Sequence, residues 1–283
     1  DTMCHPDGEV SFFNDVAFNI APTPLEIKSY AKRLNVNLES SGIDEGGLSI
    51  KQCLDSGYMV LSTPHAKVVL DVALIGPDYL PGHGHADTLA FEMSLFGKRV
   101  FVNSGISQYG TGLVRQRERG TAAHNTVVIN NENSSEVWSG FRVARRARPF
   151  GLVIDKNETS ISVSCAHDGY KRLSGRPIHQ RSWTITDGQL LIEDKVKGAY
   201  DTAAAYFYLH PDIKIVRNGE NGWTLQVPGC SQNVNLLVPN GSVSITSSMF
   251  SSEFGVQLPS SCFKIQFNHA NEIALEMAWN ANG

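Results

Sequence analysis

The segment Ser182-Trp-Thr-Ile-Thr-Asp-Gly-Gln-Leu-Leu-Ile-Glu193 is typical of two short strands joined by a tight turn. Apolar residues alternate with polar ones in its first half, which is the pattern of a strand with one buried face. Asp187 and Gly188 separate the two halves, and these residue types favour chain reversal. The segment therefore predicts antiparallel β structure.

The same pattern extends over most of the chain. From about Gly57 onwards, short apolar runs are separated by Gly, Asn, Asp and Pro at close intervals. This pattern predicts an all-β fold, a large antiparallel multi-sheet β-sandwich, with hardly any helix after Asn35. The apolar spacing of residues 89–95 suits a helix as well as a strand. The expected strands are 58–62, 67–75, 100–102, 125–129, 160–164, 182–186, 189–193, 204–209, 213–216, 223–227, 233–238, 242–245, 263–267 and 272–277.

A helix is expected near the start of the chain. Thr23-Pro-Leu-Glu26 has the form of a capping box with proline at the first helical position, and the helix should continue to about Arg33. We therefore divide the chain into residues 1–34, the end of a helical domain, residues 35–56, a linker, and residues 57–283, the β-sandwich domain.

Composition excludes some classes of partner. A net charge of −4 and a pI of about 6.1 argue against a general nucleic-acid or membrane-surface binding protein. No apolar run is long enough to cross a bilayer. Five widely spaced cysteines are expected to be small buried residues, and their odd number leaves at least one unpaired. An anionic polysaccharide is not excluded as a partner, because the chain has a local run of basic residues: Arg115, Arg117, Arg119, Arg142, Arg145, Arg146 and Arg148.

The segment Pro81-Gly-His-Gly-His-Ala-Asp-Thr-Leu-Ala-Phe-Glu-Met-Ser-Leu-Phe-Gly97 carries most of the chemistry. His83 and His85 are two positions apart and would share one face of a strand. Asn103 and His124 lie in two further strand-like segments. Three segments thus carry polar groups typical of a metal site.

These residues also resemble a known family. The patterns H-x-H-A-D-x-L-x-F, V-[DN]-x-G-x-x-x-Y and R-G-T-x-A-H-N-T-V-V, within residues 83–149, are similar to the C-terminal domain of heparinase II/III-like proteins. That family includes polysaccharide lyases acting on heparin, heparan sulfate and alginate. The resemblance implies a β-sandwich that follows an α/α toroid, with the substrate cleft between them. Most of that toroid is expected to be missing from this chain.

The resemblance implies a zinc site formed by His85, His124 and Asn103. Zinc-binding members of the family have Asp where this chain has Asn103, and an amide oxygen is a poorer zinc donor than a carboxylate. Zinc affinity should therefore be low. Asp87 could supply the missing charge instead, or could make a cap or turn hydrogen bond.

The resemblance also implies catalytic roles. His83 matches a catalytic-site histidine, which could take the C5 proton of a uronate or bind its carboxylate. Tyr109 is a candidate general acid, and an aromatic lid or packing residue is the alternative. Arg119 and Arg115 are candidates for binding acid groups. For Arg115 and Arg117 a solvated edge strand is the alternative.

Glu136, Trp138 and Phe141 could lie near the sugar, or could be core or interface residues.

The function implied is a polysaccharide lyase that cleaves an acidic, uronate-containing glycan by β-elimination. A non-catalytic carbohydrate-binding or surface-polysaccharide biosynthesis protein on the same scaffold is the alternative. A glycan hydrolase-like sandwich is a third interpretation, and it predicts a pair of carboxylates flanking the cleft. The family suggests a periplasmic or secreted location. A cytoplasmic location stays open, because residues 1–7 lack the basic and apolar regions of a signal peptide.

Overall fold

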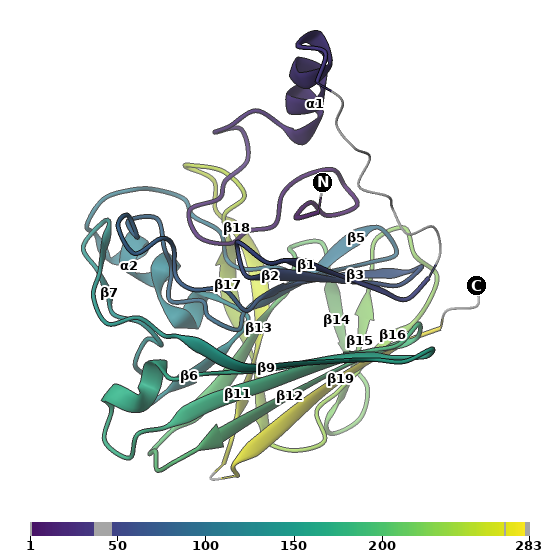
Figure 1. The fold of residues 1–283 in the computed structure, drawn as a ribbon. Helices are drawn as coiled ribbons and strands as arrows, with labels where there is room; N and C mark the ends of the chain where they lie inside the picture. The colour runs from purple at the N-terminus through teal and green to yellow at the C-terminus, as the bar shows by residue number, and fades with distance from the viewer. Residues whose placement is uncertain (1, 37–46, 269, 281–283) are drawn as a thin grey trace.

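The computed structural model describes residues 2–36, 47–268 and 270–280. Antiparallel sheets are the main regular structure of these residues, which also contain two α-helices (Figure 1). The predicted all-β, multi-sheet fold is confirmed. The hairpin that we expected at Asp187-Gly188 is formed by two neighbouring strands whose register pairs Ile185 with Leu190.

Three sheets enclose the core. The first has five strands in the order β1-β2-β3-β4-β5, and it precedes the others in the sequence. Its strands are β1 (Ser49–Cys53), β2 (Tyr58–Ser62), β3 (Ala66–Asp71), β4 (Phe91–Leu95) and β5 (Lys98–Phe101).

The second sheet has eight strands in the order β14-β15-β16-β19-β12-β11-β10-β9 and lies opposite the first (Figure 1). Its strands are β9 (Pro149–Lys156), β10 (Ile161–His167), β11 (Ile178–Ile185), β12 (Gln189–Lys197), β14 (Lys214–Arg217), β15 (Gly222–Gln226), β16 (Val234–Leu237) and β19 (Glu272–Trp279).

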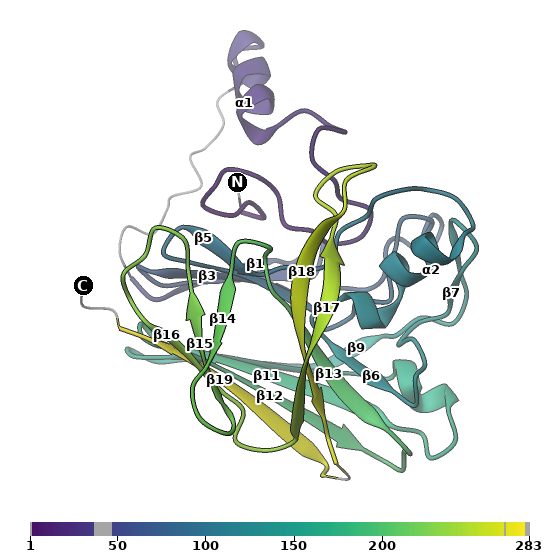
Figure 2. The same cartoon turned by 180° about the vertical axis from the view of Figure 1, so that it is seen from behind.

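The third sheet has the order β17-β18-β13-β6, and its long β17–β18 pair is clearest from behind (Figure 2). Its strands are β6 (Val127–Ile129), β13 (Ala203–Tyr208), β17 (Ser242–Phe250) and β18 (Leu258–Gln266). A separate small hairpin joins β7 (Val137–Trp138) to β8 (Arg142–Val143). Two short 3-10 turns are η1 (Thr121–Ala123) and η2 (Gly169–Arg172).

One buried apolar cluster joins the three sheets. It includes Leu61 of the first sheet, Trp183 of the second and Phe263 of the third, all essentially inaccessible to solvent. Along β11, buried residues alternate with half-buried ones, as the sequence pattern predicts. Burial of this apolar surface is the main force that holds the sheets together.

The structure settles one open alternative and departs from the sequence-based expectation in two other places. Residues 89–95, which suited either a helix or a strand, contain β4. β1 lies within the stretch that we expected to be a linker, although residues 37–46 of that stretch fall outside the described residues. The segment Leu113–Arg119, for which an edge strand was the alternative interpretation, is the short helix α2.

The N-terminal residues cross the first sheet before the chain reaches helix α1 (Pro24–Arg33) (Figure 1). α1 has the predicted capping box between Thr23 and Glu26. Upstream of it, Arg99 of β5 donates hydrogen bonds to the Asp7 carboxylate and to the Glu9 carbonyl. These contacts fix the segment that we call the N-terminal strap, residues 3–18, against the β domain.

Among the described residues, no helix is both long and apolar enough to span a membrane. All five cysteines are free, as their odd number required for at least one. Burial is confirmed for Cys4, Cys165 and Cys262, and the other two are half-buried.

Candidate functional site

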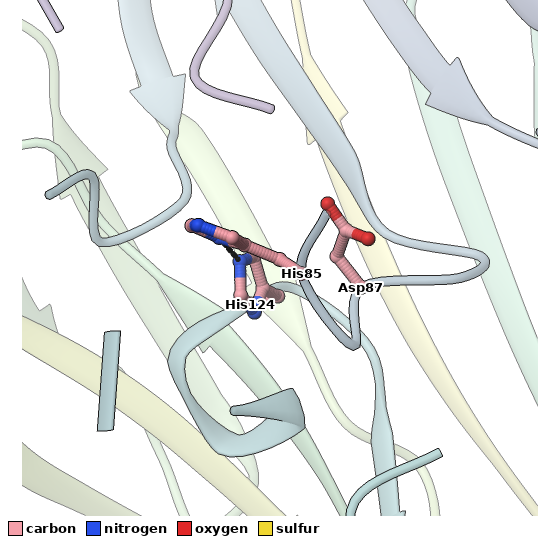
Figure 3. Close-up of side chains that lie close together, drawn as sticks. All are labelled: His85, Asp87 and His124. Atoms are coloured by element: carbon pink, nitrogen blue, oxygen red, sulfur yellow. Dashed lines mark hydrogen bonds between the residues drawn. The ribbon is translucent and has the colours of Figure 1, made fainter. Parts of the chain in front are cut away.

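Two buried imidazoles meet between the loop that follows β3 and the turn that follows η1 (Figure 3). His85 Nδ1 lies 3.0 Å from His124 Nε2, and both residues are about 2% exposed. Asp87, from the same loop as His85, completes a group whose potential ligand atoms all lie within 4.8 Å of one another. The two predicted histidine ligands are therefore brought together.

Hydrogen bonding determines which nitrogens of this pair carry protons. His124 Nδ1 lies 2.8 Å from the Gly120 carbonyl oxygen, which only accepts, so His124 donates there. His85 Nε2 lies 2.8 Å from an Asp15 carboxylate oxygen and donates to it. In the neutral imidazoles, the two nitrogens that face each other then both carry lone pairs, an arrangement that requires a cation between them.

The cation is either a proton or a metal ion. Burial lowers the pKa of both histidines, that of His124 to about 3, and this opposes a proton. A metal-binding histidine commonly donates its other N–H to a carboxylate or backbone carbonyl, as His85 and His124 do here with Asp15 and Gly120. The donor set fits a metal ion.

Asp87 adds a second sign of a cation site. Its carboxylate is buried, and Oδ2 has no hydrogen-bond partner. Burial raises the pKa of Asp87 to about 7, although backbone N–H groups of Asp87 and Asn14 act in the opposite direction. Two imidazoles and a carboxylate form a set that zinc accepts.

Asn103 is held differently. Its side-chain oxygen accepts from the Asn125 N–H at 3.1 Å, and its amide donates to the Phe12 carbonyl at 2.9 Å. Its own N–H donates to Glu92. These contacts fix the strap and the His124 segment against each other. The predicted role of Asn103 as a metal ligand stays a prediction.

Asp15, on the strap, is the functional residue that sequence reasoning did not single out. Its carboxylate accepts from His85, from His83 Nδ1 at 2.9 Å and from both terminal nitrogens of Arg115. Burial alone would raise the pKa of Asp15, but the hydrogen bonds from His85 and Arg115 hold it well below its usual range. One anion thus joins the buried imidazoles to the surface.

His83 and Tyr109 lie at that surface. The His83 side chain is 62% exposed, and its ring centroid is 6.2 Å from that of Tyr109. The Tyr109 ring also contacts Phe141 and Phe254. Burial of its hydroxyl, followed by the nearby Asp15 charge, raises the pKa of Tyr109 and favours the protonated phenol. A histidine, a phenol and aromatic faces therefore share one exposed area.

Segment 81–90, in contrast, is a loop and not the strand that we expected. His83 and His85 do not share a strand face. They share the Asp15 carboxylate instead, one from the exposed side and one from the buried side.

The predicted substrate-binding arginines are both fully buried. Arg115 pairs with Asp15 and donates to the Gly140 carbonyl, and Arg119 donates to the carbonyls of Gly84 and Gly140. In this structure, acceptors inside the domain hold both guanidinium groups. The predicted role of Arg115 and Arg119 in binding acid groups stays a prediction.

The remaining candidates, Glu136, Trp138 and Phe141, all lie at the surface. Trp138 and Phe141 have large exposed faces, and the Phe141 ring centroid lies 5.7 Å from that of His83. Glu136 pairs with Arg145 on the surface. Aromatic faces of this kind suit pyranose stacking.

Residues 45–276 match the family described as heparinase II/III-like, C-terminal. The chain belongs to this family. Comparison with curated proteins gave no match.

Solved structures show the same fold. A heparinase III gene product matches with a TM-score of 0.75 and 17% identity, covering 99% of this chain and 45% of its own. A heparan sulfate lyase from Pedobacter heparinus matches with a TM-score of 0.76 and 15% identity, covering 98% and 45%. The chain therefore spans less than half of the length of these heparinase II/III-like structures.

Proposed function

We propose that this chain is the β domain of a polysaccharide lyase that cleaves an acidic, uronate-containing glycan by β-elimination. The observation that carries the proposal is the exposed His83, oriented by Asp15 and adjacent to Tyr109, in a member of the heparinase II/III-like family. Solved structures with the same fold are described as heparan sulfate lyases, which supports the class of substrate.

His83 is suited to act as the base. Its Nδ1 donates to the Asp15 carboxylate, which leaves a lone pair on Nε2. The carboxylate also stabilises the imidazolium that forms when Nε2 takes the C5 proton of the uronate. The electron pair of the broken C5–H bond forms the C4=C5 double bond.

Tyr109 is suited to act as the acid. Its raised pKa keeps the phenol protonated at neutral pH, so it has a proton to donate. As the bond from C4 to the glycosidic oxygen breaks, the leaving oxygen takes the Tyr109 proton. Exchange with water then returns a proton to Tyr109 and removes one from His83. The aromatic faces of Phe141 and Phe254 beside Tyr109 provide apolar contact for a sugar ring.

We propose further that His85, His124 and Asp87 hold a zinc ion, with Asn103 as the ligand that the family pattern adds. When bound, the ion supplies positive charge and links the two loops that carry these residues. Asp15 orients His85, and Gly120 orients His124.

The lyase proposal is tested by incubating the intact protein with heparan sulfate and with alginate and following the ultraviolet absorbance of the unsaturated uronide. His83→Ala should abolish the product while leaving thermal stability unchanged, because the side chain is largely exposed. His65→Ala is the control, since the His65 ring contacts Phe96, which is not part of the candidate site, in a tilted arrangement. Full turnover by His83→Ala would remove His83 from the mechanism. Failure of the wild type on every uronate polymer would favour the carbohydrate-binding alternative.

The zinc proposal has its own test. Zinc titration of the metal-free protein should give one equivalent of binding that Asp87→Asn weakens strongly. Asn103→Asp should raise zinc affinity if residue 103 is a ligand, because it restores a carboxylate. An unchanged affinity would show that Asn103 only joins the strap to the His124 segment.

A further inference from the structure

A second buried polar cluster lies behind the imidazole pair, on the eight-stranded sheet. Arg181 of β11 is inaccessible to solvent and forms a bidentate pair with Asp194 of β12, at 2.7 Å for each bond. Asp194 also accepts from His179 at 2.6 Å, and His179 Nδ1 lies 3.2 Å from His167 Nε2. None of these four residues contacts His83 or Tyr109 in the described structure.

The protons of this cluster are fully assigned by its partners. The Gly169 N–H donates to His167 Nδ1, so a neutral His167 carries its proton on Nε2 and donates to His179. His179 in turn donates from Nε2 to Asp194. Each neutral imidazole has one donor and one acceptor in use, unlike the His85–His124 pair. This cluster therefore needs no cation beyond Arg181.

One terminal nitrogen of Arg181 reaches beyond the cluster. Nη1 donates to the Leu89 carbonyl at 2.9 Å and also to the Asn125 carbonyl. Leu89 ends the loop that carries His85 and Asp87, and Asn125 directly follows His124. A single guanidinium thus holds both segments of the candidate metal site.

The Leu89 backbone needs such a restraint. Its φ of +65° lies in the left-handed region, which a leucine rarely adopts and which stores strain. Its N–H donates to the Asp71 carbonyl and its own carbonyl accepts from Arg181. The strained conformation ends the loop two residues after Asp87, so its release would move the His85–Asp87 segment relative to His124.

We propose that Arg181 is a positioning residue that fixes the His85–Asp87 loop and the His124 segment in the register needed for metal binding. The inference rests on the proposed zinc site. Asp194 and His179 orient the guanidinium, since its Nε and Nη2 are used by the carboxylate and only Nη1 reaches the two carbonyls. Residues that orient metal ligands commonly change metal affinity ten- to a hundred-fold when replaced.

The test compares zinc affinity, measured by competition with a chromophoric chelator, in three variants of the intact protein. Arg181→Lys keeps the charge but lacks the fork that meets Asp194 and both carbonyls together. Arg181→Met combined with Asp194→Asn leaves no lone buried charge, and the asparagine oxygen can still accept from His179. Leu225→Ala, in the buried core of β15 on the same sheet, is the matched control for lost stability.

Both Arg181 variants should lose zinc affinity at least ten-fold, and Leu225→Ala should stay within two-fold of the wild type. Wild-type affinity in Arg181→Lys would overturn the proposal. Failure of both Arg181 variants to fold would also overturn it, because the residue would then serve the stability of the whole domain.

If the wild type binds no zinc, the proposed metal site fails and amide exchange decides the inference. Faster exchange in segments 83–90 and 120–126 of Arg181→Lys, but not of Leu225→Ala, would support it, and equal exchange would overturn it.

Discussion

At the scale of single residues, Asp15 is a buried anion on which several groups of the candidate site depend. Its carboxylate is buried and is the acid partner of Arg115, which is itself fully buried. Removing one member of a buried ion pair leaves an uncompensated charge, which typically costs about 3–5 kcal/mol. Asp15→Asn should therefore lower the free energy of unfolding by about that amount in chemical denaturation.

A matched control exists on the same strap. Asp7 also pairs with an arginine, Arg99, but its side chain is 41% exposed, so solvent screens the pair. Asp7→Asn should lower the free energy of unfolding by about 1 kcal/mol or less. Equal losses in the two variants would show that the Asp15–Arg115 pair is not a special feature of the site.

Asp87 gives a prediction for pH dependence in the metal-free protein. Its pKa in the folded state is raised by burial to about 7, above the ordinary value of 3.8. Between these pH values the native state holds more protons at Asp87 than the unfolded state. This group therefore makes the free energy of unfolding fall as pH rises from about 4 to 7, by at most about 1.4 kcal/mol per pH unit.

Asp87→Asn should remove this decline, so the variant should gain stability relative to the wild type as pH rises through that window. Thermal denaturation in a chelator, at several pH values, measures the difference. Zinc should reverse the order, because the ion prefers the carboxylate. A constant difference across the window would show that Asp87 is already ionised and neutralised by the protein.

The sequence predicted part of the residue-level site. His85 and His124 could be paired because both stand in recognisable motifs. Asp15 could not be assigned to the site from the sequence, because it lies 70 residues from His85 and 100 residues from Arg115 in a segment without a motif. The burial of Arg115 and Arg119 could not be predicted either, since their partners are Asp15, which stands in no motif, and backbone carbonyls.

At the scale of elements, hairpins were predictable and short irregular segments were not. The β11–β12 hairpin follows from local alternation and a turn signal. In α2, alternating arginines suggested a strand, but the helical period places Arg115, Glu118 and Arg119 on one buried face and turns Arg117 to solvent. The choice between a strand and a helix here depends on the distant hydrogen-bond acceptors of Arg115 and Arg119, which the local sequence does not show.

This division of α2 into two faces can be measured. Arg119→Ala would leave buried carbonyls of the Gly84 and Gly140 segments without donors, and should lower the free energy of unfolding by about 1–3 kcal/mol. Arg117→Ala should change it by no more than about 0.5 kcal/mol, because the side chain is exposed. If Arg119→Ala kept full stability but raised KM for a uronate polymer, that result would support the substrate-binding interpretation of Arg119 instead of a structural one.

At the scale of the whole molecule, the candidate site is open on one side. Tyr109 and Phe141 have large exposed faces next to His83, and the similar solved structures are more than twice as long as this chain. We expect the 283 residues alone to give little or no unsaturated product, since correct positioning of a substrate can contribute roughly 7–11 kcal/mol to catalysis.

The measurement compares product absorbance from the 283-residue chain with that from a longer protein that carries it, at equal concentration. Addition of zinc to both separates loss of metal from loss of a binding surface. Comparable turnover by the short chain would show that these residues form a complete active site.

The strap has a practical consequence for anyone who expresses this domain. Boundaries chosen from the matched region, residues 45–276, would discard Asp15 and leave Arg115 as a buried cation with no counter-ion. Such a product would lack the counter-ion of its own site, and its inactivity would then be wrongly attributed to the shorter length of the chain. An expressed fragment that begins before residue 3 keeps the Asp15 carboxylate with Arg115. It must then also include helix α1, although α1 forms no part of the sheets.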